Sequence, residues 1–413
     1  MSEITDARPP GVHFTGVPEL PGDHSVAFLA QGYLFGHRRF EALRADAFRT
    51  RLMGRRVTML RGHDAARFFY TGERFTRVGA MPRSVLHSLQ DEDSVQTLVG
   101  VAHAERKALF LEMLDESGRA ALTEAFEQEW DRAQATWLHE PVSLLNASAG
   151  VLTDAVLRWL GLEESATRRL ALTHETMAMI DGAGSVGPRN WFGRTARRSS
   201  ERWALSVVRR LRSVGVPESS PLRVLLHADL EDEVAAVELL NLVRPTVAVS
   251  RFIAFAGLAL HRHSSWVERV RDDDEALRAF TQEVRRTTPF FPVIGGRAAV
   301  HAQWRELSVR PGDWVVLDLF ATNRHPAEWH DAARFDPSRF ERESSAHVVA
   351  QGAGGIDRTH RCPGEPATID LLDVAVRRLA AADWSVPQQD LRVDLTRIPA
   401  LPGTRGMTVR MRT

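Results

Sequence analysis

The sequence predicts a mainly helical fold with a small β region, in a single domain spanning residues 1–413. Helical periodicity dominates from about Asp91 to Phe290, whereas short strand-like segments separated by Pro and Gly turns follow Pro289. The chain shows no repeat, low-complexity tract or linker that would divide it. Apolar residues make up 44% of the chain, which suffices for a large core.

Two helices are expected in the first part of this region. Residues 102–114 alternate charged and apolar faces at helical spacing, with Leu109 and Met113 on one side. A longer helix should begin at Asp229, a capping residue followed by acids in the first turn. It could run past His261, about 30 residues, and so cross the whole core. Pro245 inside it removes a backbone hydrogen bond and should kink or loosen it.

The C-terminal part mixes helices and strands. A helix over Asp274–Thr287 should end before Pro289, as the pre-proline rule expects. Residues 290–296 and 314–319 are strand-like and are separated by a turn at 311–313. A further helix is predicted from about Pro366 to Ala381.

Composition excludes several classes of protein. Lys+Arg and Asp+Glu both total 53, so nothing indicates a nucleic-acid partner, and the Arg194, Arg197, Arg198 cluster is expected to be a solvated face. The N-terminal residues lack the pattern of a signal peptide. Residues 239–260 are apolar but contain Arg244, Pro245, Ser250 and Arg251, which argues against a membrane span. With a single cysteine and hence no intrachain disulfide, we expect a cytoplasmic protein.

That cysteine lies in an unusual loop, QGAGGIDRTHRCPG, at residues 351–364. A glycine-rich loop that delivers one thiolate before a helix suits a haem-iron ligand, because a thiolate pushes electron density onto the metal and favours O–O cleavage. A lone cysteine is more often a small buried hydrophobe. The neighbours His360-Arg361 and Pro363-Gly364 are not a core context and favour the ligand interpretation.

Three separated motifs resemble the cytochrome P-450 superfamily. They are the loop around Cys362, the E-x-x-R pair of Glu283 and Arg286, and Phe335-Asp-Pro-Ser-Arg-Phe, whose Arg339 would join the pair in a buried charge triad. An E-x-x-R alone means little, but in this order and spacing the set is specific. The resemblance implies haem b, bound between the long central helix and the cysteine loop.

The resemblance is closer to the bacterial fatty-acid peroxygenases and covers about Phe75 to Asp370. In that branch the central helix carries Arg-Pro, as Arg244-Pro245 does here, where monooxygenases carry an acid–alcohol pair. It implies a peroxide-driven enzyme that acts on a fatty acid and needs no obligatory redox partner. Open alternatives are an alkene-forming decarboxylase, the same chemistry on another carboxylic acid, and a haem-binding sensor or carrier without turnover.

The chemistry of Arg244 agrees with this resemblance. A guanidinium in an apolar helix is costly unless it is paired, and its fork matches a carboxylate. The substrate carboxylate would be the partner and could act as the general acid–base for hydrogen peroxide. The alternative is a structural arginine that pairs with an internal Asp or Glu, such as one of residues 231–233.

Further site residues follow from the resemblance. Gln96 falls where members carry His or Gln, and a neutral amide cannot donate a proton as an imidazolium can, which favours hydroxylation at the alpha or beta carbon. Its alternative role is that of a loop amide. The propionate contacts would be His103, Lys107, Arg297 and His360, and the haem and acyl channel would be lined by Phe290, Phe291, Pro292 and Val293. Solvated side chains and plain strand core are the respective alternatives. Gln90 replaces a phenylalanine common in the family, which affects the expected pocket shape.

Overall fold

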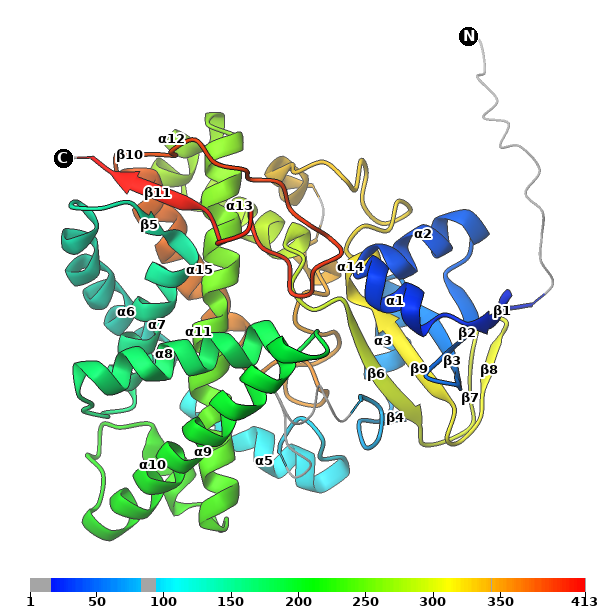
Figure 1. Cartoon of the computed structure of the whole chain (residues 1–413). Coiled ribbons are helices and arrows are strands. Elements are labelled where there is room, and N and C mark those ends of the chain that lie inside the picture. Colours follow the sequence, from blue (N-terminus) through cyan, green and yellow to red (C-terminus); the bar gives the residue numbers. More distant parts are fainter. Residues whose placement is uncertain (1–15, 83–93, 343, 413) are drawn as a thin grey trace.

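The computed structural model describes residues 16–82, 94–342 and 344–412. Figure 1 shows a large helical part and, at the other end, a smaller part built around a β-sheet. The helices are α1 (Ser25–Gln31), α2 (Leu34–Leu43), α3 (His63–Tyr70), α5 (Gly100–Met113), α6 (Glu116–Trp137), α7 (Leu144–Trp159), α8 (Ala166–Gly182), α9 (Pro188–Val214), α10 (Leu222–His227), α11 (Asp232–Arg262), α12 (Ser265–Asp272), α13 (Asp274–Thr287), α14 (Leu319–Thr322), α15 (Glu365–Ala381) and the 3-10 helices η1 (Pro337–Glu341) and η2 (Ser345–His347).

The strands form three sheets. They are β1 (Glu19–Asp23), β2 (Ala47–Leu52), β3 (Arg55–Leu60), β4 (Phe75–Thr76), β5 (Val142–Ser143), β6 (Val293–Ala298), β7 (Ala302–Trp304), β8 (Leu307–Val309), β9 (Trp314–Asp318), β10 (Trp384–Ser385) and β11 (Thr408–Met411). The largest sheet has the order β1-β2-β3-β9-β6-β4, and β10-β11-β5 and β7-β8 form the smaller ones. In the large sheet β9 pairs in parallel with β3 and antiparallel with β6, so it joins the N-terminal strands to the C-terminal ones.

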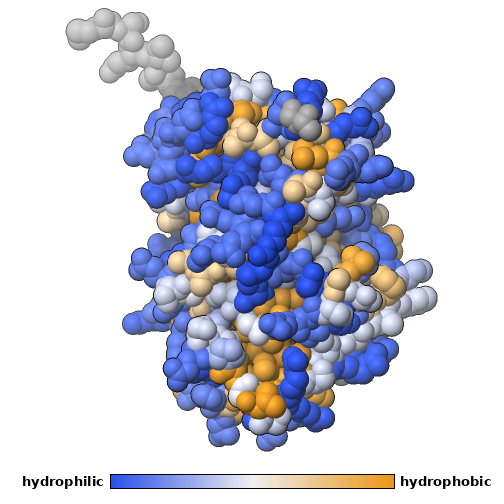
Figure 2. Space-filling view, turned by 90° about the vertical axis from the view of Figure 1, so that its left-hand side faces the viewer, coloured by the Kyte–Doolittle hydropathy of each residue, from blue (hydrophilic) through white to orange (hydrophobic). Residues whose placement is uncertain are grey.

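The central helix α11 runs through the helical part of the molecule (Figure 1). It has 31 residues, and its apolar residues cover its whole circumference, which is typical of a buried helix. By length and composition it could cross a membrane, but 83% of its apolar window is buried inside the protein, as expected for a core helix. Figure 2 shows that the outer face on the helical side is mainly hydrophilic, with apolar side chains gathered in limited areas.

The start of α11 differs from the prediction. The helix begins at Asp232, with Glu231 at the cap position and no side-chain cap, so the expected capping role of Asp229 is wrong. Arg212 on α9 donates to the carbonyl of Leu230 at 2.7 Å and pairs with Asp232 at 2.6 Å, which holds the preceding residues outside the helix. The predicted length and the acidic first turn are confirmed, and the helix continues through Pro245.

The C-terminal predictions are confirmed except at the strand boundaries. Helix α13 covers Asp274–Thr287 as predicted, and α15 begins one residue before Pro366. The first strand starts only at Val293, because Pro289 and Pro292 have no N–H to donate to a neighbouring strand. The hairpin β7–β8 and the N-terminal strands were not predicted from the sequence.

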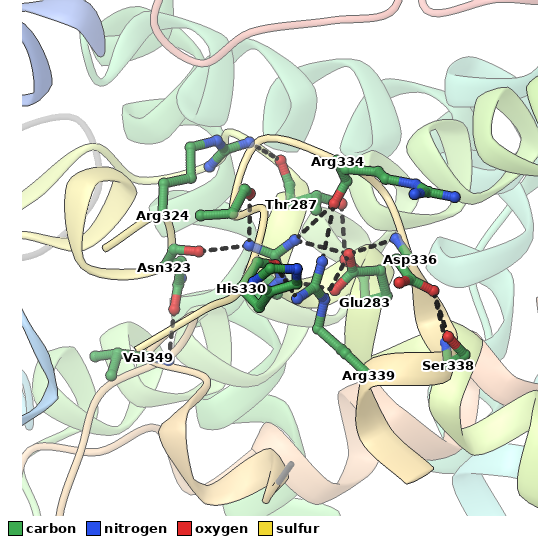
Figure 3. A network of polar contacts seen from close by, with 12 residues as sticks. Glu283, Thr287, Asn323, Arg324, His330, Arg334, Asp336, Ser338, Arg339 and Val349 are labelled. Carbon is green, nitrogen blue, oxygen red and sulfur yellow. Dashed lines mark hydrogen bonds and ion pairs between the residues drawn. The ribbon is translucent and has the colours of Figure 1, made fainter. Parts of the chain in front are cut away.

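Glu283, Arg286 and Arg339 meet in the interior, and Figure 3 shows the surrounding network. Arg286 makes a two-pronged contact with Glu283 at 2.6 and 2.7 Å, and the Nε of Arg339 donates to Glu283 Oε1 at 3.2 Å. All three side chains are at most 2% exposed. Arg286 also donates to the carbonyls of Asn323 and Ala332. The triad therefore ties α13 to the long loop segment that leads to the cysteine loop.

Candidate active site

A cavity of about 330 Å³ lies between α11, α5, the start of β6 and the cysteine loop. None of the described residues that line it is an Asp or a Glu, whereas arginine, lysine and histidine side chains do line it. The residues that line it include Arg77, Gln96, His103, Lys107, Asn241, Arg244, Pro245, Phe252, Phe290, Phe291, Val293, His360 and Cys362. The cavity therefore suits a ligand that has an apolar body and a negatively charged group.

The cysteine loop delivers Cys362 to this cavity. The Cys362 N–H donates to the carbonyl of Gln351 at 2.9 Å, which closes the loop. Gly352 has a φ of +112°, and a Cβ there would lie 2.8 Å from the Cα of Arg361, so the turn requires glycine. Burial raises the pKa of the Cys362 thiol, against the backbone N–H of Gly364 and the charge of Lys107, which both favour the thiolate. A bound metal cation would favour the thiolate further.

Basic side chains cluster beside the cysteine loop. Lys107, one turn after His103 on α5, donates to the carbonyl of Arg361 at 2.6 Å and also to that of Thr359. The rings of His103 and His360 are in contact, tilted by 32° with their centroids 3.9 Å apart. Burial, aided by the nearby charges of Lys107 and Arg77, lowers the pKa of His103 to about 4. The sequence predicted His103, Lys107 and His360 as members of one group, and the structure brings these three side chains close together.

Arg77 is a cavity residue that the sequence reasoning missed. It is 7% exposed, donates to the carbonyl of Gly295 at 2.8 Å and lies over the ring of Phe69, 4.4 Å from its centroid. Among the described residues no carboxylate forms a salt bridge with it. The only sequence signal was its position just after Phe75, within the part of the chain that resembles the family. Nothing in the sequence indicates that it lies near His103 in the fold.

Arg297 and Pro292 do not line the cavity, contrary to the prediction. Arg297 donates to the carbonyl of Gly79 at 3.1 Å and lies over the ring of Trp314, at a surface groove with Arg55 and Arg56. A strand rises about 3.3 Å per residue, so Arg297 is carried about 10 Å beyond the cavity-lining Ile294. Pro292 is buried beside α14, where its carbonyl accepts from Leu319.

Phe290, Phe291 and Val293 do line the cavity, as predicted. Phe290 packs edge-on against Phe252 of α11, with centroids 5.5 Å apart. Phe291 is 41% exposed, so it reaches from the cavity to the surface. The ring of Phe290 contacts those of Phe252 and Phe291, and the three rings give the cavity an apolar wall.

Arg244 lines the cavity and is 6% exposed, and among the described residues its side-chain partner is an amide rather than a carboxylate. Its Nη2 donates to Asn241 Oδ1 at 2.7 Å, and Gln96 Nε2 donates to the same oxygen at 3.3 Å. Burial, with the nearby charge of Arg197, lowers the pKa of Arg244 to about 9, still cationic at neutral pH. No described carboxylate forms a salt bridge with it.

The alternative of an internal pair with the acids at the start of α11 is wrong. Asp232 and Glu233 pair with Arg209 at 3.2 and 2.8 Å on the outside of the protein. Asp232 precedes Arg244 by about 18 Å along the helix axis. Gln90 lies outside the described residues.

The chain was compared with known proteins. No family model matches it. A curated relative, cytochrome P450 120 of Synechocystis sp., is 25% identical over 94% of this chain and 96% of its own. The solved structure of P450EX alpha (CYP152N1) with myristic acid has a TM-score of 0.90 and 34% identity, over 95% of this chain and 98% of that one.

The chain belongs to the CYP152 peroxygenases, a branch of the cytochromes P450. P450SP alpha (CYP152B1) with (R)-ibuprophen matches at a TM-score of 0.90 and 35% identity, over 94% and 98% of the two chains. An OleT variant with arachidonic acid matches at 0.92 and 26%, over 96% and 98%. This peroxygenase is therefore a haem enzyme, with haem b as its cofactor.

The cavity of the peroxygenase fits that cofactor. Cys362 supplies a sulfur at one wall, Arg77 and Lys107 supply positive charge, and the neutral imidazoles of His103 and His360 can donate hydrogen bonds, without a carboxylate among the described lining residues. Haem b carries two carboxylates, for which such a cluster is the expected partner. Arg244 lies apart from the cysteine loop on α11, which leaves its charge for a second anion.

Proposed function

We propose that this chain, acting as one domain, uses hydrogen peroxide to hydroxylate fatty acids at the alpha or beta carbon, with Arg244 binding the carboxylate. The observation that carries the proposal is the buried guanidinium of Arg244 in a cavity whose described lining holds no Asp or Glu. A buried charge of this kind is costly until a partner arrives, and a carboxylate matches it with two hydrogen bonds.

The cofactor would be held by the cluster described above. Cys362 would supply the sulfur that binds the iron, and His103, Lys107 and His360, together with Arg77, would receive the propionates. When bound through a thiolate, the haem supplies the iron chemistry that favours O–O cleavage. Lys107 also donates to the carbonyls of the loop, so it would hold the loop and the cofactor at the same time.

The bound carboxylate would complete the catalytic machinery. Arg244 would hold it beside Gln96, where it can accept and return a proton of hydrogen peroxide. Pro245 follows directly and lines the same cavity, and it leaves the carbonyl of Asn241 without its usual helical donor. Because the guest brings the acid–base group, turnover should need a carboxylic acid and no electron-transfer protein.

Gln96 favours hydroxylation over decarboxylation, because its neutral side chain has no proton to give as an imidazolium would. A decarboxylase that forms terminal alkenes is the alternative for the same substrate. A carboxylic acid other than a fatty acid is the second alternative, and it is favoured by the relative that was solved with (R)-ibuprophen. We place the enzyme in the cytoplasm, without a membrane or nucleic-acid partner.

The test is a product assay with the purified holoenzyme, hydrogen peroxide and tetradecanoic acid, analysed by mass spectrometry. We expect 2- and 3-hydroxy acids without any reductase, and none from methyl tetradecanoate, which lacks the carboxylate. A predominance of tridecene would favour decarboxylation. Equal turnover of acid and ester, or turnover only with a reductase, would contradict the proposal.

A further inference from the structure

A buried carboxylate stands behind the contact between Asn241 and Arg244. Glu238, one turn before Asn241 on α11, has an exposed fraction of 0%. Its Oε1 accepts from the N–H of Val95 at 2.9 Å and from Arg106 of α5 at 2.7 Å. Its Oε2 accepts from Asn241 Nδ2 at 2.8 Å. Three donors therefore surround this carboxylate, and one of them carries a charge.

These contacts set the orientation of the Asn241 amide. An ionised carboxylate only accepts hydrogen bonds, so the NH₂ of Asn241 must face Glu238. The amide oxygen then faces the opposite way, where Arg244 and Gln96 both donate to it. In the reversed orientation the amide oxygen would face the carboxylate and the NH₂ would face the guanidinium of Arg244. The contacts with Glu238 and Arg244 would then be lost, and Gln96 would have to turn its own amide to keep its contact.

Glu238 itself does not line the cavity, whereas Asn241 does. The carboxylate can therefore act on a guest only indirectly, through the amide that it orients and through its charge, which raises the pKa of Arg244 against the effect of burial. Its partners extend the chain of contacts outward, since Arg106 belongs to α5 and Val95 to the segment that carries Gln96. Arg244 and Gln96, the two side chains proposed to meet the substrate, both donate to the side-chain oxygen of Asn241. Glu238, which lies outside the cavity, sets the orientation of that amide.

We infer that Glu238 is a positioning residue which, through Asn241, holds Arg244 and Gln96 in the arrangement that receives a carboxylate. The inference rests on the proposed function, because it assumes that Arg244 binds the acid. Substrate binding would then depend on Glu238, a residue outside the cavity. It would also depend on which way the Asn241 amide is turned.

The decisive variant is Glu238→Gln, which replaces one acceptor by a donor at nearly constant volume. The remaining oxygen should stay with Val95 and Arg106, so the new NH₂ would face Asn241 and turn its amide around. Isothermal titration of the holoenzyme should show about tenfold weaker binding of tetradecanoic acid, the effect of one lost hydrogen bond to a charged group. Binding of methyl tetradecanoate should change less than about twofold.

The matched control is Glu233→Gln on the same helix. Its carboxylate is 64% exposed and pairs with Arg209 on the surface, so both affinities should stay unchanged. Should Glu238→Gln weaken acid and ester equally, or neither, the positioning role is wrong. Wild-type enzyme that binds acid no tighter than ester would instead refute the proposed role of Arg244, and the inference with it.

Asn241→Ala keeps the inference testable if Glu238→Gln does not fold, because it leaves the contacts of Glu238 with Val95 and Arg106 in place. It should weaken acid binding to a similar extent. Where both variants fold, the double variant should bind the acid no more weakly than Asn241→Ala alone, since Glu238 acts through Asn241. Additive losses, or unchanged acid binding by Asn241→Ala, would overturn the inference.

Discussion

The guanidinium of Arg244 donates to the side-chain oxygen of Asn241 at 2.7 Å, one helical turn away, and is not paired with a described carboxylate. The amide of Asn241 fixes the orientation of the Arg244 guanidinium without neutralising its positive charge. The charge of Arg244 therefore remains for an incoming anion, and the cofactor has its own basic cluster at the cysteine loop.

Replacing Arg244 by Ala should abolish most acid turnover while leaving the cofactor in place. Loss of one partner of a buried charge pair costs about 3 kcal/mol, or about 100-fold in kcat/KM for tetradecanoic acid. Haem content, measured from the absorption spectrum of the reduced pyridine complex, should stay at the wild-type level. Arg198→Ala, which removes an exposed arginine of α9, is the control and should behave as wild type.

Replacing Gln96 by His should shift the product distribution towards terminal alkene. The imidazole can carry and donate a proton where the amide cannot, and it would occupy the same place beside Asn241 and Arg244. Gas chromatography with mass spectrometry of the tetradecanoic acid products gives the ratio of tridecene to hydroxy acids. An unchanged ratio would show that the product is decided elsewhere in the pocket.

Breaking the interior triad should destabilise the whole enzyme. Glu283→Gln leaves Arg286 and Arg339 buried without their carboxylate, at a cost of about 3–5 kcal/mol. Thermal unfolding of the holoenzyme should show a much lower Tm and partial loss of haem. Glu341→Gln removes one side of an exposed pair with Arg269 and should cost at most about 0.5 kcal/mol.

Asp318 should make stability depend on pH. Burial raises its pKa to about 7, far above that of an exposed Asp, so between these values the folded protein holds a proton that the unfolded chain has released. Its contribution is therefore present at low pH and is lost as pH rises through about 7. Relative to wild type, Asp318→Asn should raise Tm at pH 8 more than at pH 5, and an equal shift at both would contradict the assignment.

The sequence predicted the elements whose signals are local. Helix α13 has an acidic start and a proline after its end, and α11 has a long apolar run, so both were found at nearly their full lengths. Strand β3 was missed because it pairs with β9, more than two hundred residues further along the chain. Strands β1 and β2 join the sheet through β3 and were missed with it. Asp229 looked like a cap, but contacts of Arg212 from another helix decide where α11 begins.

The sequence found residues that line the cavity where a motif marks them within a short stretch, as at Cys362 and Arg244. Arg77 was missed, and Arg297, predicted as a propionate contact, lies at a surface groove instead of the cavity. Which arginine faces the cavity depends on the path of the strands, which the sequence does not show. Asn241 was not predicted as a site residue, since an asparagine on a helix gives no sequence signal of a shared acceptor. Its role follows only from the positions of Glu238 and Gln96 around it.

A crystal structure of the holoenzyme with tetradecanoic acid tests the central claim most directly. The account predicts both carboxylate oxygens within hydrogen-bonding distance of the Arg244 guanidinium, with Asn241 still accepting from it and the acyl chain along Phe290. A carboxylate bound elsewhere, or an Arg244 turned away onto Glu238 while the acid occupies the cavity, would contradict it.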